Sequence, residues 1–421
     1  MTLRFSHPWV TFSALSALFF LVSSATFSSL GVVLPAMVRE LHWNWTQAGL
    51  GYTLLGIACG LSSVAAAMCV RRLGVRGTIL GGTALLIGGF GCLAITGSVW
   101  LYLLGTVLLG VAFSLSTTVP GTHVLTGLFT RQSTVIGAYF TIGALGGVAG
   151  PLLYVIIAPD FGWRAYWWVF VTASAVVGLF AASSIPENLN RTAPDLKHPE
   201  PVGPAELIGG LKDWTVRHAL ATSQFYVIVG AYTMYLLINT TAHGFAVQHL
   251  VEHGVSANAA AGMLSLEALI GAGIAVVGGI VGEKVSSKTL LIVALVALIA
   301  GMTGLAEAYG PILMMVYAIG VGIGFGLSFV ASTMLLLKYF GRPAYLELYS
   351  IMCLLSTAAA LGPAVGGWAH DTLGSFAGVF HMCSVAAFVM LIATIFMHPP
   401  VLNRERRESA APLPTSAPDH A

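Results

Sequence analysis

The chain has 421 residues, of which 57% are apolar and only 8% are charged. An ordinary soluble domain carries roughly 25% charged residues, so this composition excludes a water-soluble globule. The high apolar content equally excludes a disordered chain. The class that remains is a protein that crosses the membrane many times.

Twelve apolar segments are long enough to cross a bilayer as helices. A hydrocarbon core of about 30 Å requires roughly 20 apolar residues per helix. The uninterrupted apolar run 290–306 is unlike the short alternating strands of a membrane barrel. We therefore predict an all-α polytopic protein with 12 transmembrane helices. Their predicted ranges are 9–36, 47–70, 77–97, 100–125, 133–158, 164–184, 218–245, 257–282, 288–308, 310–337, 347–369 and 375–397.

Basic residues predict the orientation of these spans. If the N-terminus lies in the cytoplasm, only Arg39 and Arg164 of the 18 Lys and Arg residues fall on the outer side. This asymmetry follows the positive-inside rule and places both termini in the cytoplasm. The short loops favour a bacterial inner (plasma) membrane as the location.

The two halves of the sequence repeat each other with an offset of 212 residues. The matched pairs are Gly110 and Gly322, Phe113 and Phe325, Gly150 and Gly362, Pro151 and Pro363, and Arg72 and Lys284. We predict two homologous six-helix bundles, 1–184 and 218–397. A cytoplasmic linker, 185–217, joins them, and a flexible tail, 398–421, follows. Such repeats are typical of secondary transporters, which bind substrate near the midplane between the halves.

Two copies of a short motif support a family resemblance. The stretch 279–288 follows the pattern G-x-x-x-D-R-x-G-R-K, with Glu283 in the place of the acid. In the earlier copy, 67–76, Arg71 stands where the acid is expected. With these motifs and the Gly-Pro pairs, the chain resembles transporters of the major facilitator superfamily over its membrane part. The stretch 31–45 is similar to the monocarboxylate and oxalate/formate antiporter branch.

This resemblance implies that the motif acid lies near the start of a helix in the other half, where a negative charge meets the positive helix end. We predict two ionic gates, Glu283 with Arg131 and Arg71 with Glu347, which close when the cavity faces outward. The basic residues Arg72 and Lys284 follow the two motif positions. The alternative is a set of independent solvated charges placed by the positive-inside rule.

Small residues recur at four-residue spacing in two of the predicted spans, where they permit close helix packing in lipid. The residues at this spacing are Gly143, Gly147 and Pro151 in one span and Ala358, Gly362 and Gly366 in the other, and the Gly-Pro motifs add Gly146, Gly150 and Pro363. We interpret them as the faces along which the two halves rock, with the prolines bending the helices. The alternative is tight packing without a hinge role.

Only one carboxylate falls deep within a predicted span, and it is Glu267. A central acidic residue costs about 2.5 to 3.5 kcal/mol on insertion scales, so it is a functional-site hypothesis by default. Burial favours the neutral carboxyl, which makes Glu267 a candidate proton carrier. The alternatives are a protonated carboxyl that bridges helices, or a shorter helix that leaves Glu267 near the interface.

The resemblance implies that helices 1, 4, 7 and 10 line the cavity. In the seventh span, Tyr232, Tyr235, Asn239 and His243 share one face. A polar stripe facing lipid is costly, so we expect it to face the cavity, where His243 is a candidate proton-carrying group. The further candidates are Phe27, Phe113, Ser116, His123, Tyr317 and Ser328. The alternative for the histidines is a packed structural role.

Fixed positive charge is missing from the predicted spans. The oxalate/formate resemblance implies a basic residue where Ala275 stands. A desolvated dianion would then lack a counter-charge, which disfavours oxalate. A neutral or cationic solute fits Glu267 better, and a monoanion could enter with a proton.

These features predict a secondary active transporter of a small organic solute, monocarboxylate-like or neutral, that works by proton-coupled alternating access as a symporter or antiporter. The alternative is an exporter of hydrophobic or cationic compounds, and a rival class is a non-transporting membrane sensor. We expect no enzyme activity, cofactor, metal or disulfide, because no suitable cluster occurs and all five cysteines lie in apolar runs. The expected partners are the solute, protons and lipid, without nucleic acid, and the expected state is a monomer.

Overall fold

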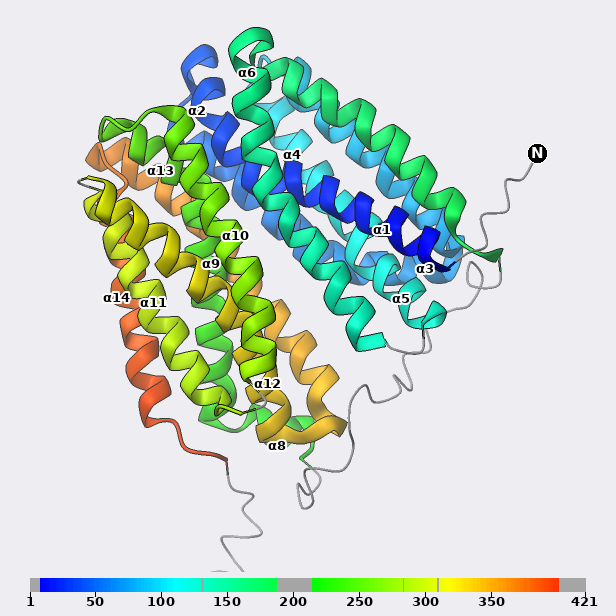
Figure 1. The fold of residues 1–421 in the computed structure, drawn as a ribbon, viewed down its shortest axis with the longest axis vertical. Helices are drawn as coiled ribbons and strands as arrows, with labels where there is room; N and C mark the ends of the chain where they lie inside the picture. The colour runs from blue at the N-terminus through cyan, green and yellow to red at the C-terminus, as the bar shows by residue number, and fades with distance from the viewer. Residues whose placement is uncertain (1–7, 130–131, 188–213, 283, 309, 401–421) are drawn as a thin grey trace, which may run out of the picture.

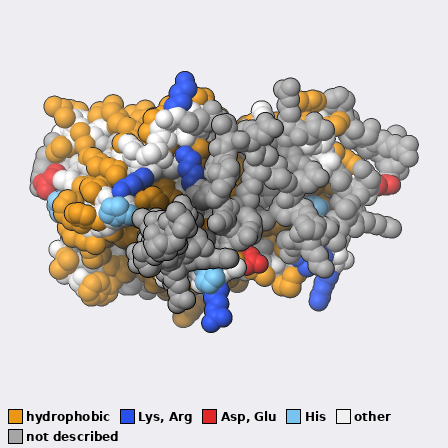
Figure 2. Space-filling model, turned by 90° about the horizontal axis from the view of Figure 1, so that it is seen from below, with side chains coloured by type: hydrophobic (Ala, Val, Ile, Leu, Met, Phe, Trp, Pro, Cys, Tyr) orange, Lys and Arg blue, Asp and Glu red, His pale blue; other side chains and the backbone are white. Residues whose placement is uncertain are grey.

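The computed structural model describes residues 8–129, 132–187, 214–282, 284–308 and 310–400. Within these ranges the regular structure is helical, and strands are absent. Large apolar side chains are exposed on the outside of the bundle, for example Trp100 (81%) and Ile312 (78%). Figure 2 shows hydrophobic side chains over much of the described surface. A surface of this kind fits a lipid environment, and the chain is an integral multi-pass membrane protein.

The first bundle contains six membrane-crossing helices. Its elements are α1 (Pro8–Ser23), the π-helical segment η1 (Ser24–Ser28), α2 (Ser29–Leu41), α3 (Trp45–Ile95), α4 (Val99–Phe113), the π-helical segment η2 (Ser114–Thr118), α5 (Val119–Leu128) and α6 (Gln132–Ser184). The elements α1, η1 and α2 together form the first crossing helix, and α4, η2 and α5 form the fourth. The long elements α3 and α6 each supply two.

The second bundle repeats this arrangement and packs beside the first (Figure 1). Its elements are the short helix α8 (Val216–Leu220), then α9 (Ser223–Glu252), α10 (Ala257–Val281), α11 (Ser287–Glu307), α12 (Pro311–Ser356), the 3₁₀ segment η3 (Thr357–Leu361), α13 (Gly362–Leu373) and α14 (Ala377–Phe396). The long element α12 contains the tenth crossing helix and the beginning of the eleventh, which η3 and α13 complete.

Single glycines reverse the chain inside the three long elements. Gly74, Gly162 and Gly341 have φ of 71° to 75° and ψ of 170° to 174°. This backbone region is essentially restricted to glycine. Among the described residues, ten helical stretches are apolar and long enough to cross a membrane, and two of them have 51 residues each. Such a stretch would measure about 77 Å as one helix, so each crosses twice. The prediction of 12 transmembrane helices is confirmed.

The start of the second bundle differs from the predicted span 218–245. The helix α9 begins at Ser223, because the hydroxyl of Thr222 caps it by accepting from the Phe225 amide. The separate helix α8 precedes it. Most of the predicted linker, 185–217, lies outside the described residues.

The repeat is visible in matching contacts between helices. A Cβ added to Gly110 would meet the carbonyl oxygen of Leu55, and one added to Gly322 would lie 2.8 Å from that of Glu267. The two contact partners, Leu55 and Glu267, are 212 residues apart in the sequence, and so are the two glycines. The same helix-to-helix packing therefore occurs in each bundle, which confirms the predicted pseudo-symmetric pair.

The two bundles join at one end of the molecule, which we call the closed end; it carries the connections at 42–44, 253–256 and 374–376. Here Asp371 of α13 binds the first turn of α3, and the Ser265 hydroxyl donates to the carbonyl of Val148 at 3.1 Å. Toward the opposite end the bundles diverge (Figure 1). There, a Cβ added to Gly137 or Gly279 would meet nothing within 4 Å. We call this opposite end, which carries Arg72, the basic end.

Candidate functional site

The side chain of Glu267 is buried in the middle of the second bundle. It lies on α10 and is 1% exposed. The hydroxyl of Tyr317, on α12, donates a hydrogen bond of 2.7 Å to its Oε2 atom. Tyr317 is itself fully buried. The predicted deep carboxylate therefore has a specific hydrogen-bond donor from a neighbouring helix, as buried acidic groups require.

The ring of His243 lies next to this carboxylate. Its Nδ1 atom is 2.9 Å from the carbonyl oxygen of Asn239 and 3.9 Å from Oε1 of Glu267. A carbonyl only accepts, so Nδ1 carries a proton in this hydrogen bond. The distance to Glu267 is too long for a hydrogen bond but short enough for charge interaction. The structure thus brings together His243, Tyr317 and Glu267, which we call the Glu267 cluster.

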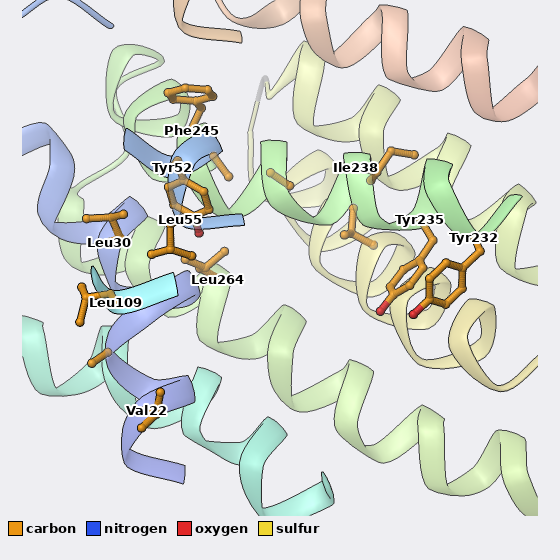
Figure 3. Packing of buried hydrophobic residues seen from close by; sticks show 14 of the residues in the cluster. Val22, Leu30, Tyr52, Leu55, Leu109, Tyr232, Tyr235, Ile238, Phe245 and Leu264 are labelled. Atoms are coloured by element: carbon orange, nitrogen blue, oxygen red, sulfur yellow. The ribbon is translucent and has the colours of Figure 1, made fainter. Parts of the chain in front are cut away.

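The other predicted residues of the seventh crossing helix lie further along α9. The rings of Tyr232 and Tyr235 are buried, and their centroids are 5.3 Å apart (Figure 3). Tyr235 also packs at 5.6 Å on the ring of Phe325. The amide nitrogen of Asn239 is buried without a hydrogen-bond partner. Because buried donors are normally satisfied, this amide is a candidate contact for a polar solute.

The first bundle contributes aromatic rings to the same region. Phe27 lies in the π-helical segment η1, and its ring is 5.6 Å from that of Phe113. The hydroxyl of Tyr52 donates to the carbonyl of Phe27, and the two ring centroids are 6.3 Å apart. The sequence gives no signal for Tyr52, because only the approach of the two bundles brings its ring to Gly244 of α9, where an added Cβ would lie 3.9 Å away. Segments of π-helix often occur at functional sites, and here one carries Phe27.

Three further candidates do not join the Glu267 cluster. The buried hydroxyl of Ser116 lacks a hydrogen-bond partner and lies beside Gly82 of its own bundle. The hydroxyl of Ser328 is also buried without a partner, and His123 is half-buried. Their role in the solute pathway stays a prediction.

The predicted gates fall at the basic end. Glu283 and Arg131 lie outside the described residues, whereas Lys284 is exposed. Arg71, Arg72 and Glu347 are also exposed. Among the described side chains, Arg71 and Glu347 form no ion pair within 4 Å. Because the bundles diverge at this end, a separated pair agrees with a gate that closes only in the opposite state, and the pairing stays a prediction.

In the first bundle, the predicted small residues pack α6 against the first crossing helix. A Cβ on Gly146 would meet the carbonyl of Phe20, and one on Gly150 would meet that of Ser24. A Cβ on the neighbouring Gly147 would lie 3.0 Å from the Ser28 hydroxyl of its own bundle and 3.6 Å from Ala268 of the second bundle. Adjacent positions of α6, which contains Pro151, therefore serve packing within the bundle and packing between bundles.

In the eleventh crossing helix, the small residues likewise contact both their own bundle and the other one. A Cβ on Gly362 would meet the Thr241 hydroxyl, and one on Gly366 would lie 2.6 Å from the ring of Phe245, both within the second bundle. The carbonyl of Pro363 lies against Gly49 of the first bundle. Whether these glycines and prolines act as hinges stays a prediction.

This architecture, with a buried carboxylate beside the contact between two repeated bundles, defines a multi-pass membrane transporter. A model of the Major Facilitator Superfamily matches residues 16–356. The chain therefore belongs to the Major Facilitator Superfamily, whose members are transporters and not enzymes.

Solved structures show the same fold. A mutant of the nucleoside transporter NupG aligns with a TM-score of 0.75 and 14% identity, covering 92% of this chain and 99% of that one. A mutant of the peptide transporter POT aligns with a TM-score of 0.73 and 14% identity, covering 93% and 94%. At this identity the likeness concerns the fold alone. No protein with a curated description matches the sequence.

Proposed function

We propose that this transporter is a secondary active carrier that moves a small organic solute by alternating access and couples it to protons at Glu267. The observation that carries the proposal is the Glu267 cluster. Within the described ranges, every other Asp or Glu in a crossing helix lies near a helix end, whereas Glu267 is 1% exposed in the bundle interior. An ionisable group at such a position is costly, and its usual role is in an ion or substrate pathway.

The position of Glu267 also links its charge to the contact between bundles. On the same helix, Ser265 and Ala268 contact α6 of the first bundle. The backbone carbonyl of His243 lies against Gly31, again in the first bundle. Gain or loss of a proton at Glu267 therefore changes the electrostatics next to residues that hold the closed end together. This arrangement supports proton coupling to the rocking of the halves.

The surrounding side chains support a solute without multiple negative charges. Lys and Arg are absent from the interior of the described crossing helices, and Ala275 provides no counter-charge. The unpartnered amide of Asn239 offers a hydrogen bond, while Phe27 and Phe113 offer apolar surface. We propose a neutral metabolite or a monocarboxylate-like solute that enters with a proton. The resemblance of 31–45 to the monocarboxylate and oxalate/formate branch supports the second choice.

A second candidate is an exporter of hydrophobic or cationic compounds by proton antiport. The rings of Phe27, Phe113 and Tyr52 favour it, because aromatic faces attract cations and Glu267 offers the opposite charge. Membership of the transporter family argues against a non-transporting sensor. Measurement of solute flux in proteoliposomes distinguishes the proposed carrier, the exporter and the sensor.

The test begins with a thermal-shift screen of the purified protein against monocarboxylates, neutral amino acids and hydrophobic cations. Each stabilising compound is then assayed in proteoliposomes with an imposed pH gradient. We expect the wild type to accumulate solute, and we expect Glu267→Gln to lose accumulation while it retains solute counterflow. Glu307→Gln, which changes an exposed acid, is the matched control. Accumulation by Glu267→Gln at the wild-type level would reject the coupling role, and binding without any flux would favour a sensor.

A further inference from the structure

The first turn of α3 needs hydrogen-bond partners at the closed end. The first four amides of a helix have no acceptor within the helix. The Asn44 side chain accepts from the Gln47 amide at 2.8 Å, and the Asn44 carbonyl accepts from the Ala48 amide at 3.2 Å. These local bonds leave the amides of Trp45 and Thr46 to be satisfied by another part of the chain.

The second bundle supplies both missing acceptors through one carboxylate. The Trp45 amide donates to Oδ1 of Asp371 at 2.9 Å, and the Thr46 amide donates to Oδ2 at 2.8 Å. The Thr46 hydroxyl donates to the same Oδ2 at 2.5 Å. All three hydrogen bonds are charge-assisted, and they lie at the positive end of the α3 dipole. Asp371 therefore completes the N-terminal cap of a helix that belongs to the other bundle.

Close packing along the two helices holds Asp371 in this place. One turn before it, Gly367 lies against the carbonyl of Trp45, where a Cβ would not fit. Further along, the amide of Ala364 donates to the Thr53 hydroxyl at 3.1 Å. Because side chains on a helix point toward its N-terminus, the Asp371 carboxylate is directed back along this line of contacts.

The neighbouring charged groups are engaged elsewhere. Glu252 lies 3.1 Å from Nε2 of His370 and accepts from Gln248 at 2.8 Å, all within the second bundle. The His370 ring packs 5.6 Å from that of Trp45. Among the described residues at this contact, Asp371 is the acid that reaches across to α3.

We propose that Asp371 is a latch, a positioning residue that stabilises the closed end and must release the amides of Trp45 and Thr46 each time that end opens. The sequence predicted acids at helix starts on the basic end, whereas the structure shows this arrangement on the opposite end. The latch does not depend on proton coupling at Glu267. Its effect is on the balance between the two access states, because it is formed in only one of them.

The test is hydrogen–deuterium exchange of the purified full-length protein. Loss of a charge-assisted bond in Asp371→Asn or Thr46→Val should speed backbone exchange in segments 45–56 and 357–368 by about ten-fold. Thr46→Ser keeps the hydroxyl and should exchange like the wild type. The matched control is Glu307→Gln, because Glu307 is an exposed acid at the same end that pairs with His381 at 3.1 Å within its own bundle.

Two outcomes would overturn the latch. Wild-type exchange in segment 45–56 of both Asp371→Asn and Thr46→Val would show that the contact does not hold the closed end. An equal rise in segment 287–307, which is remote from the contact between bundles, would show that Asp371 supports the whole fold instead. A rise confined to the two segments that meet at the closed end supports the proposal.

Discussion

Leu55 and Glu267 occupy equivalent places in the two bundles but have opposite chemistry. They are 212 residues apart, both are buried, and the backbone of each packs against an equivalent glycine, Gly110 or Gly322. Leu55 belongs to the hydrophobic core, whereas Glu267 accepts a hydrogen bond from Tyr317. The comparison teaches that the same backbone position holds a hydrophobic core residue in the first bundle and an ionisable residue in the second.

At the positions of the first bundle that correspond to the partners of Glu267, the sequence has glycines. Gly31 corresponds to His243, and Gly105 corresponds to Tyr317. Gly31 has a different use, because its missing side chain lets the carbonyl of His243 approach from the second bundle. The two equivalent positions of the first bundle therefore offer no side-chain partner for a carboxylate at position 55.

The largest expected effect follows from Leu55→Glu. This change removes a buried leucine, which costs about 3 kcal/mol, and buries an acid without partners, which costs about 2.5 to 3.5 kcal/mol. We expect a loss of stability of about 6 kcal/mol and a strongly lowered Tm in detergent. The reciprocal Glu267→Leu should keep the fold but lose proton-driven accumulation. A Leu55→Glu protein with the wild-type Tm would contradict the claim that only the second bundle accommodates an acid at this position.

A smaller effect is expected from Tyr317→Phe, which removes the donor to Glu267. Tyr102→Phe is its matched control, because the buried Tyr102 hydroxyl donates at 2.8 Å to the carbonyl of Ala48 in the first bundle. Each change should lower stability by about 1 kcal/mol. Only Tyr317→Phe should lower proton-driven accumulation in proteoliposomes, by about ten-fold. Equal transport by the two variants would contradict a functional role for the Tyr317 bond.

His243→Gln should have a weaker effect than Tyr317→Phe. The His243 ring is held by the Asn239 carbonyl and lies 3.9 Å from Glu267, so its influence on the carboxylate is electrostatic. We expect a reduction in transport of about three-fold, which corresponds to roughly 0.7 kcal/mol. His381→Gln, at a partly exposed histidine of the closed end, should transport normally. Transport by His243→Gln below that of Tyr317→Phe would reverse the assigned order of the two partners.

The smallest effect is expected at the basic end. Exposed ion pairs contribute about 0 to 1 kcal/mol and often close to zero, so reversal of Arg71 or of Glu347 alone should lower transport by about two-fold. Reversal of both charges together should restore the rate. If the losses are simply additive, the two residues are independent solvated charges and the predicted gate is wrong.

Much of the fold was predictable from sequence, because apolar runs are local signals. The crossing helices, the repeat and the isolated Glu267 all follow from residue type and spacing. The reversals at Gly74, Gly162 and Gly341 were not predictable, since a helix-length apolar run does not reveal where the backbone takes a positive φ. At these three places the sequence predicts loops of several residues between spans, whereas in the structure one glycine interrupts an otherwise helical backbone.

The site was only partly predictable for a related reason. Tyr317 and His243 were identified because polar residues in apolar spans stand out. Tyr52 and Asp371 were missed, because their roles depend on contacts between segments far apart in the chain; Asp371 and Trp45 are separated by 326 positions. Neither helical periodicity nor the 212-residue offset reports such contacts between the bundles.

Proton linkage in solution tests the central claim most directly. Purified protein in weakly buffered detergent solution is mixed with a solute that stabilises it, and a pH-sensitive dye records proton uptake or release. We predict a proton signal for the wild type and for Tyr102→Phe, and none for Glu267→Gln that still binds the solute. An undiminished signal from Glu267→Gln would contradict the account.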